Sequence, residues 1–337
     1  MNQKHTLKTI GDRFGVTPAT VSRALNDKPD IGFETKRKIQ EYAKEIGFSL
    51  NLNARSLRTN QTGAIGVVIT DLENTFYTSV VNNIERVANE AGYVLMLLAT
   101  KNDKEKEAEA IRTLVQKRVD GMLISPVSGS SISLDPLERS GIPYVGITKP
   151  FSDPRANFVA VDDFQCGFLA TEHLLKKGHE RICFISGSLS SSSCRKRKEG
   201  YLAALKQWEN PYHAVIETKD YRIQSAYECM QKLLVKEPPF SGVVTYNDNF
   251  AIGAIHAITQ KQIAIPDRIA VIGMDGIEFG EFILPRLTTL KIPSEEIGCK
   301  ACSILLDNIK ERKNGGESHK EKQRIMMLPS LLLRESV

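Results

Sequence analysis

The sequence has 337 residues, of which 41% are hydrophobic and 25% are charged. At about 150 residues per domain, this length suggests two or three domains with sizeable cores. No stretch approaches the roughly 18 uninterrupted apolar residues of a membrane-spanning helix. The first residues lack the apolar segment of a secretory signal peptide. The composition therefore argues against a membrane or exported protein, and we expect a cytoplasmic location.

The six cysteines are scattered along the chain and favour reduced thiols over a disulfide framework. Cys299 and Cys302 form a CxxC pattern, but they lie within a predicted helix, 295–309, where core packing is the more common role. His173 and His179 have no further metal-ligand candidates nearby in sequence, so a structural role is favoured. We therefore expect neither a metal site nor a cofactor.

The net charge of +5 is concentrated at the amino-terminal end. Residues 1–60 contain eleven Lys or Arg and six Asp or Glu, whereas the remaining residues carry 34 of each sign. Periodic apolar residues separate these charges, which favours a folded segment over a solvated tail. A small basic folded unit on a neutral body indicates a polyanionic partner.

Three helices are predicted in residues 1–49. The first follows the N-cap residue Thr6 and ends at Gly15. The second follows Thr17 and has Pro18 at its first position, where a missing N–H costs little. The third runs from about 34 to 46 and ends at Gly47. Two short helices joined by a glycine turn and braced by a third indicate a helix-turn-helix. A helical hairpin that docks onto the body is the alternative.

Side chains suited to DNA lie on the second helix of this unit, away from its apolar residues. A helix-turn-helix places its second helix in the major groove of DNA. Hydroxyl groups suit phosphate oxygens, and an arginine suits the O6 and N7 atoms of guanine. The candidates from spacing are Thr17, Thr20, Ser22, Arg23 and Asn26.

From residue 63 onward, apolar strands alternate with helical segments. Strands are predicted at 64–72, 93–100, 120–126, 142–148, 158–162, 181–187, 213–218, 241–248 and 269–275, and helices at 76–92, 107–119, 167–178, 199–208, 225–236 and 251–262. Such alternation indicates parallel sheets covered on both faces. Because one domain would not comfortably hold so many units, we expect two doubly wound subdomains, with crossings at Asp162 and Lys291.

No signature of a common enzyme class is present. The sequence lacks a phosphate-binding loop, a dinucleotide-binding GxGxxG, a GxSxG nucleophile elbow and an HExxH zinc helix. No nucleophile and base form a recognisable pair, so we expect a binding protein rather than an enzyme.

Polar and aromatic residues gather where the predicted strands end, which is where α/β folds bind ligands. Carboxylates, an amide, a guanidinium and aromatic faces together suit a polyhydroxylated small molecule. A capping or turn role is the alternative for any single strand-end aspartate. The candidates are Asp71, Phe76, Tyr77, Asp162, Ser191, Ser193, Arg197, Tyr221, Asn247 and Asp275.

The stretches "TLKTIGDRFGVTPATVSRALNDKPDI" and "ARSLRTNQT" resemble the headpiece and linker of the LacI/GalR family of bacterial transcription regulators. By position, the resemblance implies that Pro18, Ala19 and Arg23 face bases. It also implies that Thr17, Thr20, Ser22 and Asn26 contact phosphates. The sequence departs from the family at Gly32, where a serine cap is usual before the third helix.

The linker 50–62 is too short to form a stable helix alone in water. The resemblance implies a hinge helix that folds on operator DNA and inserts Leu57 between base steps, with Arg55 beside it. Packing of Leu57 on the body is the alternative. Leu50 stands where the family usually has proline.

The body also resembles this family, in "TDLENTFYTSVVNNIE", "GSLSSSSCRKRKEGYLAAL", "TYNDNFAIGAIHAI" and "AVIGMDGIEFGEFILPRLTTLK". The resemblance implies a fold like the type I periplasmic binding proteins, with effector and dimerisation functions in residues 63–337. The N-subdomain would comprise about 63–162 and 291–324, and the C-subdomain about 163–290 and 325–337. The positions implicated in effector contact are Phe76, Ser191, Ser193, Arg197, Tyr221, Asn247 and Asp275.

"LSSSSCRKR" is closer to the sugar-responding members than to the purine-responding one, and its basic run leaves an anionic effector open. The end of the chain shows no leucine heptads, which favours a homodimer over a larger assembly. We therefore expect a nucleoid-associated repressor that binds double-stranded operator DNA under control of a sugar-like effector. A periplasmic-type solute receptor and a sugar- or nucleoside-processing enzyme are the alternatives.

Overall fold

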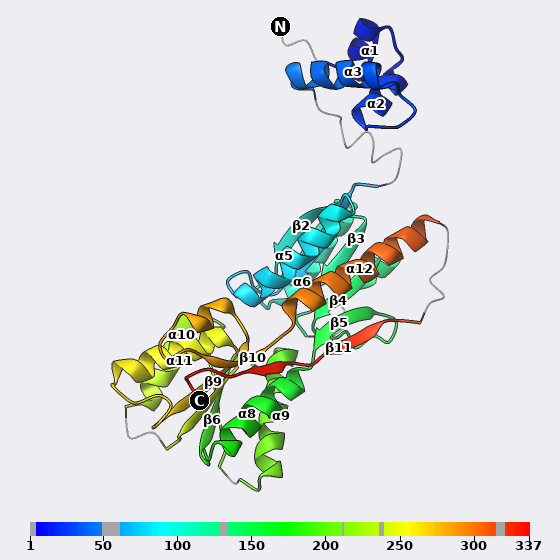
Figure 1. The fold of residues 1–337 in the computed structure, drawn as a ribbon. Helices are drawn as coiled ribbons and strands as arrows, with labels where there is room; N and C mark the ends of the chain where they lie inside the picture. Colours follow the sequence, from blue (N-terminus) through cyan, green and yellow to red (C-terminus); the bar gives the residue numbers. More distant parts are fainter. Residues whose placement is uncertain (1–4, 49–60, 129–133, 211, 236–238, 315–320) are drawn as a thin grey trace. The chain divides into compact units, whose positions relative to one another are not determined.

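The computed structural model describes residues 5–48, 61–128, 134–210, 212–235, 239–314 and 321–337. The chain forms two compact units, Met1–Thr62 and Gly63–Val337 (Figure 1). Each unit has its own hydrophobic core, so each is described by itself below.

The first unit contains three helices, α1 (Leu7–Phe14), α2 (Pro18–Leu25) and α3 (Phe33–Glu45). Both predicted caps are present: the Thr6 side chain accepts a hydrogen bond from the Thr9 N–H, and that of Thr17 accepts one from the Thr20 N–H. Gly15 ends α1 in the left-handed conformation, with φ of 67°. The predicted helix-turn-helix is thus confirmed, with bounds that differ by one residue in α3.

Apolar side chains from all three helices form the core of this unit. Ile10, Val21, Ala24 and Ile39 are buried together. Gly11 is required where α1 approaches the turn, because a Cβ atom there would lie 2.5 Å from the Val16 carbonyl oxygen. The apolar face of α2 is therefore turned inward, which leaves its other face available to a partner.

The second unit is built on two six-stranded sheets, and the predicted architecture is confirmed. The first sheet has the order β11-β5-β4-β3-β1-β2 and is parallel throughout. The second has the order β12-β10-β9-β8-β6-β7 and is parallel except for the pair β10 and β12. We call the parts around them the first lobe, residues 63–161 and 292–327, and the second lobe, residues 162–291 and 328–337.

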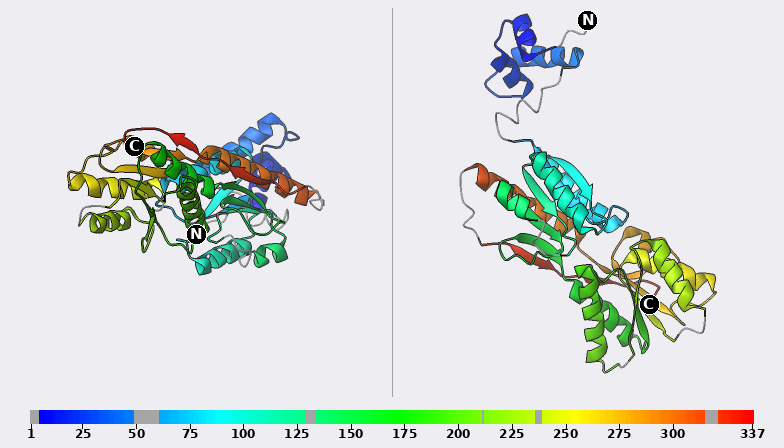
Figure 2. Two further views of the ribbon diagram at one scale, coloured as in Figure 1. Left: turned by 90° about the horizontal axis from the view of Figure 1, so that it is seen from below. Right: turned by 180° about the vertical axis from the view of Figure 1, so that it is seen from behind.

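The elements of the first lobe are β1 (Ala64–Ile69), α5 (Thr75–Glu90), β2 (Val94–Ala99), α6 (Lys104–Gln116), β3 (Gly121–Ile124), α7 (Asp135–Ser140), β4 (Tyr144–Thr148), β5 (Asn157–Val161), α12 (Ser294–Lys313) and β11 (Arg324–Met327). Helices α5 and α12 cover one face of its sheet, and α6 and α7 cover the other (Figure 2).

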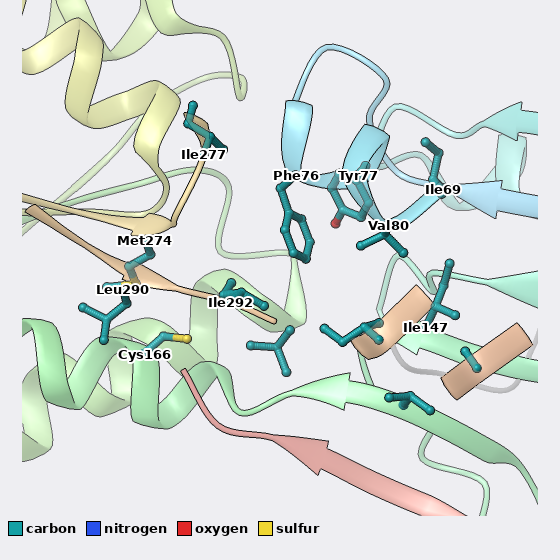
Figure 3. Packing of buried hydrophobic residues seen from close by; sticks show 14 of the residues in the cluster. Ile69, Phe76, Tyr77, Val80, Ile147, Cys166, Met274, Ile277, Leu290 and Ile292 are labelled. Atoms are coloured by element: carbon teal, nitrogen blue, oxygen red, sulfur yellow. The ribbon is translucent and has the colours of Figure 1, made fainter. Parts of the chain in front are cut away.

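The elements of the second lobe are α8 (Asp163–Lys176), β6 (Ile182–Ser186), α9 (Ser192–Gln207), β7 (Ala214–Glu217), α10 (Ile223–Leu233), β8 (Gly242–Thr245), α11 (Asp248–Gln260), β9 (Ala270–Asp275), the 3-10 helix η2 (Glu278–Glu281), β10 (Thr288–Lys291) and β12 (Ser330–Leu332). Helices α8 and α9 cover one face of its sheet, and α10 and α11 cover the other. The apolar core on the α5 side of the first lobe continues into the α8 side of the second (Figure 3).

The chain passes between the lobes three times among the described residues: after Val161, after Lys291 and between Met327 and Ser330. The first two positions agree with the crossings predicted at Asp162 and Lys291. The third corrects the subdomain boundary that we placed near 324/325. Strand β11 pairs in parallel with β5, so the first lobe keeps the chain through Met327.

Helices α8 and α9 lie in backbone contact where they cross. A Cβ atom on Gly167 would lie 1.8 Å from the Arg197 carbonyl oxygen, and one on Gly200 would lie 2.0 Å from that of Phe164. Only glycine is compatible with such an approach. The crossing fixes Asp163 and Arg197 relative to each other, near the boundary between the lobes.

Candidate functional site

The first unit presents α2 with its polar residues outward. Thr17, Pro18 and Ala19 are exposed at the start of the helix, as is Arg23 one turn later. These positions lie opposite the buried Val21 and Ala24. A helix with an exposed amino-terminal end and an exposed arginine has the geometry that a helix-turn-helix uses in the major groove.

The other three predicted residues of α2 are half-buried. The hydroxyls of Thr17 and Thr20 are 3.0 Å apart and hydrogen-bonded. The Asn26 side chain donates to the Ser22 carbonyl oxygen at 2.6 Å. The two threonine hydroxyl groups are thus held at the helix surface. One N–H of the Asn26 amide is already hydrogen-bonded to the backbone.

Arg23 forms an exposed ion pair with Asp30. The hydrogen bond from Arg23 lowers the pKa of the Asp30 carboxyl below its ordinary value. Exposed pairs of this kind are weak, so Asp30 can hold the guanidinium in place and still release it to a stronger partner. The predicted hinge residues Arg55 and Leu57 lie outside the described residues.

In the second unit, a small cavity lies between the lobes at the carboxyl ends of their strands. It is lined by Asn74, Phe76, Tyr77, Thr148, Lys149 and Val161 from the first lobe, and by Asp163, Ser193, Arg197, Tyr246 and Asp275 from the second. Its volume is about 20 Å³. A larger groove of about 980 Å³ adjoins it and shares Phe76 and Asp275.

Arg197 is the centre of the polar network in this cavity. Its side chain is 5% exposed, and its Nε atom donates to Asp163 Oδ1 at 2.8 Å. Its Nη1 atom lies 3.4 Å from Asp275 Oδ1 and also donates to the Tyr246 carbonyl oxygen. Two carboxylates and one carbonyl oxygen therefore compensate one buried guanidinium.

A hydrogen bond joins the two lobes across the cavity. The Asn74 side chain, from the loop before α5, donates to Asp275 Oδ2 at 2.9 Å, and both residues are buried. The rings of Phe76 and Tyr77 pack edge-to-face beside this contact, at 5.3 Å between centroids. Figure 3 shows these two rings together with Ile277 and Ile292 where the lobes meet. A substitution of Asp275 thus alters a contact made by both lobes.

Hydroxyl groups form a second polar side of the cavity, within the second lobe. Ser191 and Ser193 are hydrogen-bonded at 3.0 Å, and Ser193 is hydrogen-bonded to the Tyr246 hydroxyl at 3.1 Å. The Tyr221 hydroxyl donates to the Ser188 carbonyl oxygen, and its ring lies 5.7 Å from that of Tyr246. Hydroxyls and ring faces together suit a small polar ligand with apolar surfaces.

Two family profiles cover most of the chain. The profile described as "Bacterial regulatory proteins, lacI family" matches residues 6–51. The profile described as "Periplasmic binding proteins and sugar binding domain of LacI family" matches residues 62–329. The chain belongs to the LacI family of bacterial regulatory proteins.

This LacI-family protein is similar to two curated repressors along nearly its whole length. The HTH-type transcriptional repressor PurR of Haemophilus influenzae strain PittEE is 33% identical over 98% of each chain. The ribose operon repressor of Escherichia coli strain K12 is 33% identical over 98% of this chain and 99% of its own. A LacI family transcriptional regulator from Enterococcus faecium, solved with bound ribose, is 27% identical with a TM-score of 0.72; the match covers 81% of this chain and 98% of that one. The LacI-family protein is thus a DNA-binding transcriptional repressor and not an enzyme.

The predicted effector residues of this repressor fall into two groups. Phe76, Tyr77, Ser193, Arg197 and Asp275 line the cavity, and Ser191 and Tyr221 lie next to them. The remaining three serve local structure: Asp71 accepts from the Glu73 N–H, Asp162 caps α8 through the Gln165 N–H, and Asn247 caps α11 through the Phe250 N–H. For these three, the capping or turn alternative describes the geometry.

Six further residues line the cavity but were absent from the sequence prediction: Asn74, Thr148, Lys149, Val161, Asp163 and Tyr246. Asp163 directly follows the predicted Asp162, so the strand-end signal after β5 was displaced by one residue. Lys149 follows the strand end of β4, a position that we had not used.

Some other expectations concern residues away from the cavity. Cys302 is buried in the core, while Cys299 is half-buried and accepts a hydrogen bond from Arg86 at 3.1 Å. In the part of the chain that the structure describes, no group of three or more His, Cys, Asp or Glu residues could hold a metal ion. No helix within the described ranges is long and apolar enough to cross a membrane.

The buried Asp248 makes a prediction about pH dependence. Burial and the nearby Asp275 raise the pKa of Asp248 to about 7, while hydrogen bonds from Thr289 and Ile277 oppose this shift. Because the folded-state pKa exceeds the unfolded value, the folded state is favoured at low pH, and this contribution is lost as pH rises from about 4 to 7. The free energy of unfolding should therefore decrease between pH 5 and pH 8 in the wild type. We expect this decrease to be roughly 1–3 kcal/mol smaller in Asp248→Asn.

The measurement is urea unfolding of the wild type and the variant at pH 5 and pH 8. The exposed Asp267→Asn serves as the matched control and should leave the pH dependence unchanged. An unchanged difference between pH 5 and pH 8 in Asp248→Asn would show that this carboxyl does not titrate in that range.

Proposed function

We propose that this repressor binds a pseudo-palindromic operator through α2 and that a small molecule between the lobes controls its affinity. The observation that carries the proposal is the buried hydrogen bond between Asn74 and Asp275, because it links the two lobes through a predicted effector residue. A ligand that replaces this contact changes the balance between closed and open lobes. Allosteric couplings of this kind are typically about 1–3 kcal/mol, or 5- to 150-fold in affinity.

On DNA, we infer that Arg23 reads a guanine while Pro18 and Ala19 contact bases through van der Waals surfaces. Thr17, Thr20, Ser22 and Asn26 then contact phosphates and fix the register of the helix. In the linker 50–62, Leu57 and Arg55 enter the minor groove and bend the duplex. The exposed positions of Thr17, Pro18, Ala19 and Arg23 support this assignment.

For the effector, we infer a polyhydroxylated small molecule. Ring faces from Phe76 and Tyr77 cover its C–H surface, and Asp163, Asp275 and Arg197 bind its hydroxyls. The ribose operon repressor and the ribose-bound regulator favour a sugar. The similarity to PurR favours a purine instead, at the same identity to this chain. Both classes therefore belong in the test.

We further infer that the repressor acts as a homodimer in the bacterial cytoplasm, where it meets the chromosome. Two copies are required to contact the two half-sites of a pseudo-palindrome. Large apolar side chains at and after η2 support a second copy as their cover: Phe279, Phe282 and Leu284 are 61%, 73% and 81% exposed. Such a contiguous set of exposed apolar residues marks an interaction surface.

A gel-shift titration of the full chain tests the effector site. The operator is first selected from random duplexes and then titrated with sugars, sugar derivatives and purines. We expect one class to change operator affinity by about 5- to 150-fold. Asp275→Asn should still bind the operator, because it leaves the first unit intact, but it should lose the response, because Asp275 lines the cavity between the lobes. A normal response in this variant would remove Asp275 from the site.

A further inference from the structure

Lys149 occupies an unusual position in the cavity between the lobes. It directly follows β4 in the first lobe and is 2% exposed. Its Nζ atom is buried and has no hydrogen-bond partner among the described residues. A buried ammonium without a partner is unfavourable, and proteins retain such groups mainly where they serve a function.

The backbone before Lys149 is strained in a way that directs this residue. Thr148 has a φ of 63°, although a β-branched residue rarely adopts the left-handed region. The Lys149 N–H donates to the Ile147 carbonyl oxygen at 2.7 Å, which closes a tight three-residue turn. The Thr148 hydroxyl is hydrogen-bonded to Ser125 at 2.7 Å and holds this turn. Strain of this kind clusters at ligand-binding sites.

Among the charged residues that line the cavity, Lys149 is the cation without an ion pair to a described residue. Two cations and two carboxylates line it: Lys149, Arg197, Asp163 and Asp275. Arg197 is bound to both carboxylates, whereas Lys149 forms no ion pair with any described residue. The formal charges of the cavity therefore sum to zero. The Lys149 ammonium nevertheless has no ion pair with a described residue, so it can bind an anionic group of a ligand.

We propose that Lys149 is the specificity-determining residue for an acidic group, a carboxylate or a phosphate, on the effector. This inference rests on the proposed effector site and deepens it, since it assigns the effector to the sugar acids, sugar phosphates or nucleotides. The basic run after Ser193 does not supply this function. Arg195 donates to the carbonyl oxygens of Leu189 and Ser190, Lys196 pairs with Glu199, and Arg197 is bound to carboxylates.

The test compares acidic and neutral compounds in matched pairs on the purified full chain. The pairs are ribose 5-phosphate with ribose, gluconate with glucose, glucose 6-phosphate with glucose, and inosine 5′-monophosphate with inosine. Affinity is measured by calorimetry for the wild type and for Lys149→Met, which keeps most of the length of the side chain and removes its charge. We expect at least one acidic compound to bind the wild type more tightly than its neutral partner. Lys149→Met should weaken that binding by about 10- to 100-fold.

Folding of the variant is checked without any compound. Because Lys149→Met removes a buried polar group that has no hydrogen-bond partner among the described residues, its melting temperature should equal or exceed that of the wild type. The exposed Lys101→Met, at the end of β2, is the matched control and should bind like the wild type.

The outcomes distinguish this inference from the proposed function. If a neutral compound binds as tightly as its acidic partner, or Lys149→Met binds the acidic one with wild-type affinity, the effector site stands and the role of Lys149 is wrong. If no compound of either kind binds the wild type, both are wrong.

Discussion

Replacing Arg197 with methionine is expected to lower the free energy of unfolding of the second unit by about 3–5 kcal/mol. The substitution leaves Asp163 and Asp275 as neighbouring carboxylates without their shared cation in a buried site. Trp208 is the single tryptophan of the chain and ends α9, the helix that carries Arg197. Urea unfolding followed by its fluorescence therefore reports directly on this lobe.

The pH dependence gives the same prediction a second readout. Burial raises the pKa of Asp275 to about 6, and Arg197 opposes this rise. Without the cation, the folded-state pKa of Asp275 rises further above its unfolded value, so the protonated folded state becomes favoured. The decrease in the free energy of unfolding caused by Arg197→Met should therefore be smaller at pH 5 than at pH 8. Arg195→Met is the control, because Arg195 is exposed and, among the described residues, donates only to the loop carbonyl oxygens of Leu189 and Ser190. Equal losses in the two variants would contradict a central role for Arg197.

Arg23→Ala is expected to have the largest effect on operator binding. A bidentate arginine–guanine contact contributes about 1–3 kcal/mol of discrimination. In the proposed dimer the contact is made twice, so specific affinity should fall by roughly 30-fold to 10⁴-fold. The fold should remain intact, because the Arg23 side chain is 56% exposed and its only ion pair with a described residue is the one with the exposed Asp30.

The measurement is a gel shift on selected and random duplexes at one fixed salt concentration, because the phosphate contribution varies steeply with salt. Arg23→Ala should bind both duplexes with similar affinity, close to that of the wild type for random DNA. Arg37→Ala, an exposed arginine of α3, controls for the loss of charge alone. If the two variants retain the same preference for the selected duplex, Arg23 does not read a base.

The helices of the first unit could be predicted because their signals are local. Thr6, Gly15, Thr17 and Pro18 set the ends of helices through contacts within three or four residues. The parallel sheets were likewise predictable from continuous apolar strands. Strands β10, β11 and β12 were not, because each has only three or four residues and is defined by pairing with distant strands.

The effector site was harder to predict, because side chains with the same chemistry take different roles at a strand end. Asp162 and Asp163 are adjacent, but the first caps α8 while the second binds Arg197. Which of the two turns inward depends on the close approach of α9, a tertiary feature. Lys149 gave no signal either, since a lysine after a strand is ordinarily a solvated turn residue. Its burial is a tertiary feature, because it lines the cavity between the lobes.

Three separate connections run between the lobes among the described residues, and they restrict how one lobe can move relative to the other. Sliding or detachment would stretch at least one of the connecting segments, whereas a small rotation about them stretches none. Opening the lobes therefore requires rotation about these segments, together with separation of the polar contact and of the apolar side chains that join the lobes.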